Sequence, residues 1–318
     1  MNPKILLIGT QGQVGRELNL LLPSLGDLVG LDRRQLDLTD VSALRQTVRD
    51  FRPDVIVNAA AYTAVDRAET EENLAAAVNA IAPGVMAEEA RNTGAMLVHY
   101  STDYVFDGNR RTPYQEDDRP NPLGVYGRTK LAGERAIQQS GARHLIFRTA
   151  WVYATEGKNF LLTILRLATV REQLRVVNDQ IGAPTCSHHI AAGTVRALAS
   201  FLAPESGDAH APQGIYHMTA GGETSWHGFA KAILDHASRI NAPPDWFLAA
   251  TGGKPIVARE VLPITTAEYP TPARRPAFAV LSNLRLLRVF GVQLPDWETQ
   301  LAGIFSDAEA QASPGNEG

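Results

Sequence analysis

Apolar and polar positions in the first 150 residues alternate between two kinds of segment. Apolar runs of about four to eight residues, typical of buried strands, are separated by longer stretches with a helical period. Leucines, for example, recur at spacings of three and four from Leu18 to Leu25. This alternation predicts a parallel sheet covered on both faces, a doubly wound α/β fold of the Rossmann type. The predicted strands are 4–9, 28–31, 54–58, 95–101 and 143–149, and the predicted helices are 12–25, 40–51, 71–93 (broken near Pro83) and 123–139.

The alternation weakens after Trp151. We expect helices at 159–171 and 188–202, strands at 174–177 and 215–219, and a last helix at 296–305. From Gly221 onward proline is dense, which favours a loop-rich region over a sheet. Residues 306–318 are polar and small and are expected to form a flexible tail. The division predicted from these shifts is a dinucleotide-binding domain at 1–150 and about 173–219, with a smaller, discontinuous substrate lobe at about 151–172 and 220–305.

Composition removes several classes of function. The chain has 318 residues, of which 44% are hydrophobic and 20% charged, and its formal net charge is −4. That balance argues against a general nucleic-acid binder, which carries a basic surplus. Apolar runs are too short for a membrane span or a signal peptide, so no membrane partner is expected. The single cysteine, Cys186, has no partner for an intrachain disulfide, which favours a reducing compartment, and we expect a cytoplasmic protein.

A glycine-rich turn follows the first predicted strand and opens the first predicted helix. Gly9, Gly12 and Gly15 have the spacing of a dinucleotide-binding turn, in which phosphates approach the backbone at a helix N-terminus. Asp32 follows the second strand, where an acid would accept a hydrogen bond from an adenosine ribose and favour NADH. Arg33 and Arg34 come next and could pair with a 2′-phosphate, so the choice between NADH and NADPH stays open. A purely structural turn is the alternative explanation.

A second group of residues suggests acid–base chemistry. Tyr126 and Lys130 are four apart on a predicted helix and therefore share a face. A free tyrosine has a pKa of about 10, and a nearby ammonium favours the phenolate, which makes the phenol a better proton donor. Thr102 ends the fourth predicted strand, at the sheet edge where ligands bind, and could hydrogen-bond a substrate oxygen. Such a tyrosine–lysine pair alone is common on exposed helices, but the threonine and the glycine turn make it specific.

These residues together resemble the extended short-chain dehydrogenase/reductases. The likeness runs from residue 4 to about 305 and is strongest in six segments that match the nucleotide-sugar reductases of that family. It implies reduction of the C4 ketone of dTDP-4-dehydro-6-deoxy-L-mannose, a nucleotide-sugar substrate, with NADPH or NADH as cofactor. The six segments are NAAAYTAVD (58–66), STDYVFDG (101–108), VYGRTKLAGE (125–134), RTAWVY (148–153), NDQIGAPT (178–185) and YPTPARRP (269–276).

The resemblance also assigns roles to matching positions. Tyr126 would be the general acid, and Lys130 would hold the nicotinamide ribose and lower the pKa of Tyr126. Thr102 and Asp103 would contact the sugar, and Trp151 would border it, with a plain core tryptophan as the alternative. The remaining cofactor contacts implied are the diphosphate residues Gln11, Gly12, Gln13 and Val14, the ribose acceptor Asp32, the adenine neighbours Asp37 and Leu38, and the lining residues Ala61, Tyr62 and Thr63.

Two arginines lie in the proline-stiffened segment near residue 275. Arg274 and Arg275 would hold the diphosphate of the nucleotide sugar, because guanidinium groups suit phosphate oxygens. An exposed turn is the alternative explanation for both residues.

Some members of the family are dimers bridged by magnesium through glutamates, which leaves a homodimer open here. Glu17 fits one such position, but Cys186, Ser187, His188 and His189 offer no second glutamate. This argues against a magnesium bridge, which needs hard oxygen ligands. Cys186, His188 and His189 are too close together in sequence to complete a transition-metal site.

Two other functions remain open at the level of the sequence. The same fold serves other nucleotide-sugar reductases and epimerases, because a fold does not fix its substrate. The regulatory subunit of methionine adenosyltransferase is also similar and acts as a binding partner. Intact Thr102, Tyr126 and Lys130 argue against that non-catalytic role.

Overall fold

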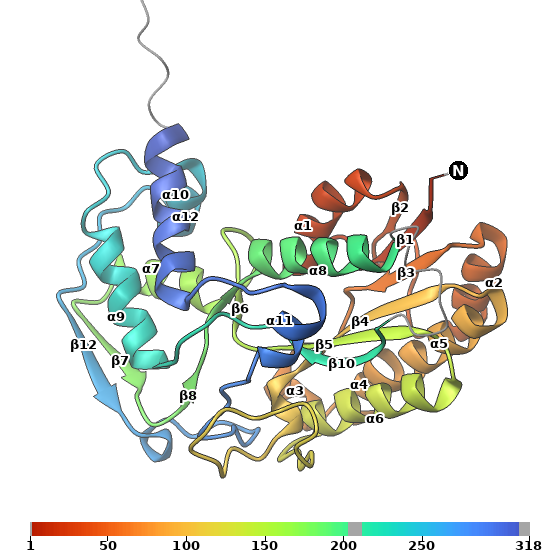
Figure 1. Ribbon diagram of the computed structural model, residues 1–318. Coiled ribbons are helices and arrows are strands. Elements are labelled where there is room, and N and C mark those ends of the chain that lie inside the picture. The colour runs from red at the N-terminus through yellow and green to blue at the C-terminus, as the bar shows by residue number, and fades with distance from the viewer. Residues whose placement is uncertain (1, 203–211, 312–318) are drawn as a thin grey trace, which may run out of the picture.

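The computed structural model describes residues 2–202 and 212–311, with side chains to residue 306. Two packed parts lie side by side (Figure 1). One is a six-stranded sheet with helices on both faces, and the other is a smaller group of helices and short sheets. Among the described residues, no helix combines the length and apolar character needed to cross a bilayer.

All neighbouring strands in the central sheet are parallel, in the order β10-β5-β4-β3-β1-β2. β1 has β2 on one side and β3 on the other, so the chain winds outward in both directions and leaves a crevice at the carboxyl ends. The predicted doubly wound fold is therefore confirmed. The strands are β1 (Lys4–Ile8), β2 (Asp27–Leu31), β3 (Val55–Asn58), β4 (Met96–Thr102), β5 (His144–Thr149) and β10 (Gly214–His217).

Helices cover both sides of this sheet (Figure 1), and apolar side chains fill the space between them. On one side, Leu18, Ile190 and Leu286 pack against sheet residues such as Val98. On the other side, Leu44, Met86 and Ile137 pack against residues such as Leu97. The first side is covered by α1 (Gln13–Leu21), α8 (Ser187–Leu202) and α11 (Leu284–Phe290), and the second by α2 (Val41–Phe51), α5 (Ala82–Thr93) and α6 (Val125–Ser140).

The smaller part has its own apolar core, which includes Leu165, Phe229 and Trp297. Its sheet is a parallel pair, β7 with β12. Residues 173–177 were expected in the dinucleotide-binding domain, but as β7 they pair here instead. The elements of this part are α7 (Phe160–Ala168), β7 (Gln173–Val177), α9 (Trp226–Ala237), α10 (Asp245–Thr251), β12 (Glu260–Ile264) and α12 (Trp297–Gln311).

The stretch after Gly221 is more regular than its proline content predicted, since it forms α9, α10, β12, α11 and α12. Pro243 and Pro244 directly precede α10, where a missing N–H costs little. Pro263 lies in a two-stranded sheet, where a strand needs hydrogen bonds on one side only. Residues 306–311, expected in the flexible tail, continue α12, and 312–318 lie outside the described residues.

Short elements complete the described chain. Strands β6 (Val152–Tyr153) and β9 (Thr185–Cys186) pair in parallel, and β8 (Ile181–Gly182) pairs with β11 (Thr224–Ser225) in antiparallel fashion. Between β3 and α5 the chain forms α3 (Val65–Ala68), α4 (Glu72–Ala76) and one π-helical turn, Ala77–Ile81. Single 3₁₀ turns lie at Leu22–Ser24, Asp103–Val105 and Thr266–Glu268.

Candidate active site

A cavity of about 470 Å³ opens at the carboxyl ends of β1, β3 and β4. This is the edge at which doubly wound sheets bind ligands. The structure gathers here residues that sequence analysis took from separate stretches of the chain. The predicted site residues that line it are Gly9, Gln11, Gly12, Gln13, Val14, Asp32, Asp37, Leu38, Ala61, Tyr62, Thr63, Tyr126 and Lys130.

The glycine turn connects β1 to α1 beneath this cavity. Gly9 has a φ of +95°, and a Cβ atom there would lie 2.6 Å from the backbone nitrogen of Ala60. Only glycine fits that conformation and that distance. Gly12 precedes α1, and Gly15 is buried within the helix. The first N–H groups of α1 therefore face the cavity without partners in their own helix, as an anion-binding helix N-terminus requires.

Asp32 lies at the end of β2 and is 6% exposed. One carboxylate oxygen accepts hydrogen bonds from the backbone N–H groups of Arg34 and Gln35, and the other accepts from the Arg34 guanidinium at 2.9 Å. The Arg34 side chain lowers the pKa of Asp32. Arg33 lines the cavity and pairs with Asp37 at 3.7 Å. The Asp32 carboxylate and the Arg33 side chain thus line this end of the cavity, with Arg34 bound to the carboxylate, and the arrangement can accept either a ribose hydroxyl or a phosphate.

The loop after β3 is held by a buried asparagine that sequence analysis missed. Asn79 Oδ1 accepts a hydrogen bond from the Tyr62 backbone N–H at 2.9 Å, and its Nδ2 donates to the Tyr62 carbonyl at 3.0 Å. Asn79 lies in the π-helical turn that leads into α5, and Pro83, the second residue of α5, is four positions after it. Pro83 has no N–H to donate to the carbonyl of residue 79, so the helix deviates from α geometry there. The predicted break near Pro83 was the available signal.

Thr102 and Asp103 lie at the end of β4, where both side chains are buried. The Thr102 hydroxyl donates to Asp103 Oδ1 at 2.9 Å and accepts from the Tyr104 N–H at 3.2 Å. The second carboxylate oxygen, Oδ2, has no partner among the described residues. Burial raises the pKa of Asp103 to about 7. A half-satisfied buried carboxyl group of this kind is able to bind a hydroxyl group of a ligand.

Tyr126 and Lys130 lie on α6, as predicted. A Cβ atom on Gly127 would lie 2.2 Å from the Tyr104 carbonyl, so the glycine lets α6 approach the end of β4. Burial raises the pKa of Tyr126 to about 12, whereas the sequence predicted a lowered value. The difference has a structural cause, because Lys130 Nζ is bonded to the Tyr100 carbonyl at 2.5 Å and lies 3.2 Å from His99 Nε2.

Two further polar groups in the cavity were not expected. Ser101 and Thr149, at the ends of β4 and β5, both line it. Their buried hydroxyl oxygens have no hydrogen-bond partner among the described residues. Unpaired buried hydroxyls are costly, so they indicate a polar ligand at this point. The periodicity of a buried strand carries no signal that would have singled them out.

Five residues expected around the sugar and its diphosphate are not among those that line this cavity: Thr102 and Asp103, described above, and Trp151, Arg274 and Arg275. Trp151 has a φ of +47° and stacks on Trp226, with ring centroids 3.5 Å apart. Arg275 forms a two-point ion pair with Asp66, at 2.9 and 3.1 Å, and Arg274 is exposed. Trp226 begins α9, so the stack connects the turn after β5 to α9.

Glu17 Oε2 lies 3.0 Å from His188 Nδ1, so the glutamate faces a histidine from α8. Within residues 2–202 and 212–306, no three His, Cys, Asp or Glu side chains are grouped as metal ligands would be. Cys186 is buried.

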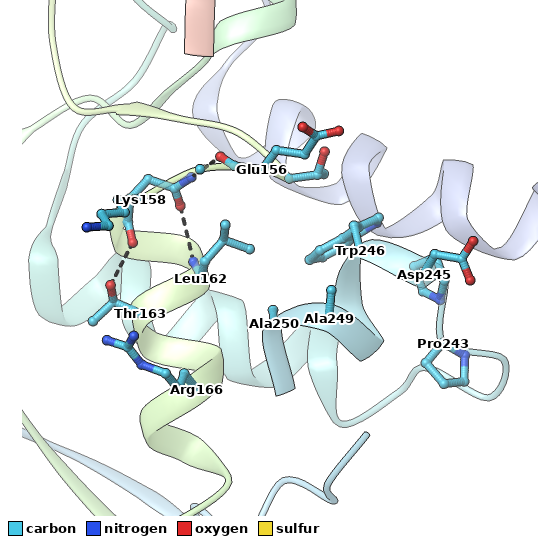
Figure 2. Close-up of a pocket in the computed structure, with 14 residues that line it drawn as sticks. Glu156, Lys158, Leu162, Thr163, Arg166, Pro243, Asp245, Trp246, Ala249 and Ala250 are labelled. Atoms are coloured by element: carbon cyan, nitrogen blue, oxygen red, sulfur yellow. Dashed lines mark hydrogen bonds between the residues drawn. The ribbon is translucent and has the colours of Figure 1, made fainter. Parts of the chain in front are cut away.

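A second cavity, of about 1260 Å³, lies between α7 and α10 (Figure 2). Gly157 and Lys158 line both cavities, so the two meet at this loop. In Figure 2 the charged ends of Lys158 and Arg166 lie on one side of α7, and Trp246 lies on the other. The lining groups therefore do not converge on one point, and the smaller cavity is the better candidate for chemistry.

Comparison with known proteins matches residues 3–310 to the family described as RmlD substrate binding domain. A curated dTDP-4-dehydrorhamnose reductase from Burkholderia thailandensis is 49% identical over 294 residues, covering 92% of this chain and 95% of that protein. The enzyme of the same name from Escherichia coli K12 is 43% identical, with 92% and 94% covered. The crystal structure of dTDP-4-dehydrorhamnose reductase from Bacillus anthracis in complex with NADP superposes with a TM-score of 0.84 at 34% identity, covering 96% of this chain and 100% of that one.

Proposed function

The chain belongs to the RmlD substrate binding domain family, and from that premise we propose that it is a nicotinamide-dependent reductase of a dTDP-linked keto sugar. It reduces the C4 ketone of dTDP-4-dehydro-6-deoxy-L-mannose and forms dTDP-L-rhamnose. The observation that carries the proposal is the position of Tyr126 and Lys130, which line the same cavity as the glycine turn. The proposed proton donor, Tyr126, therefore lies in the same cavity as the proposed dinucleotide site.

The residues present fit a nicotinamide cofactor. The glycine turn and the start of α1 suit its diphosphate, and the group around Asp32 and Arg34 suits its adenosine ribose with or without a 2′-phosphate. The unpaired hydroxyls of Ser101 and Thr149 suit polar groups at the nicotinamide end. When bound, the cofactor supplies the hydride that reduces C4. NADPH and NADH both fit this set of side chains.

Tyr126 holds the proton that the reaction needs. Its raised pKa, about 12, keeps the phenol protonated at neutral pH, so the proton is present on the Tyr126 oxygen when the ketone oxygen becomes negative. A charged Lys130 would stabilise the phenolate that remains. Thr102 and Asp103, at the neighbouring strand end, orient the sugar through hydrogen bonds.

The substrate lobe is assigned to the smaller part, built on residues about 151–172 and 220–305 together with β7. Trp151, which stacks on Trp226, provides a flat apolar boundary for a 6-deoxy sugar. The diphosphate of the sugar nucleotide is assigned to the exposed Arg274 and to Arg275, whose charge is shared with Asp66. We infer a cytoplasmic location from the single cysteine of the sequence, which has no partner for an intrachain disulfide.

The deciding experiment measures oxidation of NADPH and of NADH by the purified protein with dTDP-4-dehydro-6-deoxy-L-mannose. We expect turnover and a dTDP-L-rhamnose product by mass spectrometry and NMR. The same assay with UDP- and GDP-linked 4-keto-6-deoxy sugars tests the alternative reductases and epimerases. Turnover only with another nucleotide sugar would contradict the substrate assignment. No oxidation with any keto sugar would instead favour a non-catalytic subunit.

A further inference from the structure

The amine of Lys130 is enclosed by groups outside the sequence motif. Lys130 is 1% exposed, and its Nζ donates to the Tyr100 carbonyl at 2.5 Å. It also lies 3.2 Å from Nε2 of His99, a fully buried residue of β4. Whether Nε2 carries a hydrogen or a lone pair decides which form of Lys130 this contact stabilises.

The hydrogen bonds of β3 fix the tautomer of His99. The Ala60 N–H donates to Asn58 Oδ1 at 3.1 Å, which sets the orientation of the Asn58 amide. Asn58 Nδ2 therefore points at His99 Nδ1, 3.0 Å away, and donates to it. A ring nitrogen that accepts carries no hydrogen, so in the neutral ring the hydrogen is on Nε2.

The Nε2–H of His99 thus faces the Lys130 nitrogen. An ammonium has no lone pair and cannot accept this hydrogen, whereas a neutral amine accepts it and still donates to the Tyr100 carbonyl. Burial adds to the same preference, because a charged amine loses its hydration there. The local hydrogen-bond pattern is satisfied only when Lys130 is uncharged.

We propose that His99 is a positioning residue that keeps Lys130 mostly as a neutral amine in the free protein in mildly alkaline solution, and that binding of the nicotinamide nucleotide makes Lys130 take up a proton from solvent. The step is balanced, since one solvent proton and the amine give one ammonium. The driving force is the pair of negative charges on the dinucleotide diphosphate, together with ribose hydroxyls that accept from an ammonium. The inference rests on the proposed function, because it assigns this cavity to that cofactor.

The charged and titratable groups around Lys130 are few. His99 faces it from β4, and Tyr126 and Glu134 lie on its own helix. Glu134 favours the ammonium, but it is bound at 2.6 Å by the buried guanidinium of Arg148 on β5. Burial outweighs Glu134 and lowers the pKa of Lys130 to about 8. Burial holds the pKa of His99 well below its usual value, and a charge on Lys130 would lower it further, so His99 itself stays neutral in either state of Lys130.

The test counts protons taken up when NADH binds. Isothermal titration calorimetry of the full chain at pH 8.5, in two buffers of different ionisation enthalpy, gives the number of protons transferred per NADH bound. Because a group with a pKa near 8 is mostly deprotonated at this pH, we expect uptake of roughly half a proton or more. NADH is the probe since, unlike NADPH, it carries no phosphate monoester that could titrate.

Two variants separate the role of His99 from a general effect on folding. His99→Asn keeps an acceptor for Asn58 and removes the N–H that faces Lys130. Asn58→Asp presents an acceptor to His99 Nδ1, moves the ring hydrogen to Nδ1 and turns a lone pair toward Lys130. In both variants Lys130 should already be charged in the free protein, so uptake should fall to less than half of the wild-type value. Lys130→Met, which has no amine, should show none.

The outcomes distinguish this inference from the function on which it rests. NADH binding without proton uptake by the wild-type protein, or with equal uptake by wild type and both variants, would overturn the inference and leave the reductase assignment intact. Absence of NADH and NADPH binding would overturn both.

Discussion

At the scale of single residues, the site is organised around where protons are held. The phenol of Tyr126 keeps its proton because burial raises its pKa to about 12. Thr102 directs its own hydroxyl hydrogen at Asp103, so its oxygen is left to accept. Lys130 is bonded to His99 and the Tyr100 carbonyl and not to the phenol. In the free protein Tyr126 therefore carries its proton, but Lys130 is not positioned to stabilise the phenolate that forms when the proton is transferred.

Replacement of this proton donor tests its role. Tyr126→Phe should lower kcat by about 10²–10⁴-fold, the usual contribution of a general acid, while NADH still binds. Steady-state kinetics and NADH titration measure the two effects. Tyr104→Phe is the matched control, because Tyr104 packs edge-on against Tyr126 at 5.5 Å and loses the same single hydroxyl. Equal activity of wild type and Tyr126→Phe would contradict the assignment.

At the scale of elements, a π-helical turn holds in position a loop that forms one wall of the cavity. The π-helical turn Ala77–Ile81 exists where Pro83 removes a helical hydrogen bond, and it aims the buried Asn79 at the loop after β3. Tyr62 lies outside the strands, so its backbone N–H and carbonyl need partners from elsewhere. The Asn79 side chain forms hydrogen bonds with both groups. The loop after β3 is consequently fixed by a helical turn that follows it in the chain, and not by its own sequence.

Removal of this anchor should affect stability and cofactor affinity together. Asn79→Ala leaves the Tyr62 N–H and carbonyl without their buried partner, which costs about 1–3 kcal/mol of unfolding free energy. We also expect a higher KM for NADPH, because Tyr62 lines the cavity. Urea denaturation and kinetics measure both changes. Thr129→Val removes the 3.3 Å contact to Asn79 and the bond from the Thr129 hydroxyl to the Tyr126 carbonyl, but it leaves both bonds between Asn79 and Tyr62 in place, so it should have a smaller effect on each. An Asn79→Ala variant with wild-type stability and KM would contradict this account.

At the scale of the whole molecule, an aromatic stack and an ion pair connect segments that are far apart in the sequence. Trp151 stacks on Trp226, and Asp66 on α3 pairs with Arg275 from the C-terminal stretch. Asp66 also accepts from the Ala273 backbone N–H at 3.2 Å. The segment that carries both arginines is therefore fastened to the sheet side of the molecule.

This ion pair should give stability that depends on pH. Arg275 lowers the pKa of Asp66, so the contribution is present above the ordinary aspartate pKa and is lost as the pH falls through the lowered value. Because the pair is partly exposed, Asp66→Asn should cost at most about 1 kcal/mol at neutral pH. Urea denaturation of wild type and variant should show a difference at pH 7 that shrinks in acid. A difference that stays constant or grows in acid would contradict the sign of this effect.

The sequence by itself predicted the parallel sheet and the succession of strands and helices along the chain. It also predicted the part of the cavity wall that is formed by the glycine turn, Asp32, Tyr126 and Lys130. It could do so because apolar periodicity and local turn chemistry act over a few residues. It did not place β7, which pairs with β12, because β-pairing between distant segments leaves no local signal.

Only the tertiary structure decided what surrounds each reactive group. His99 faces Lys130 across two elements, Asn79 reaches Tyr62 from a separate helix, and Arg275 is already paired with Asp66. The direction of the Tyr126 pKa shift was mispredicted for the same reason, since burial and the orientation of Lys130 outweigh mere proximity in sequence. Hydrogen-bond direction and desolvation depend on atoms brought together by packing, and these set the chemistry of the site.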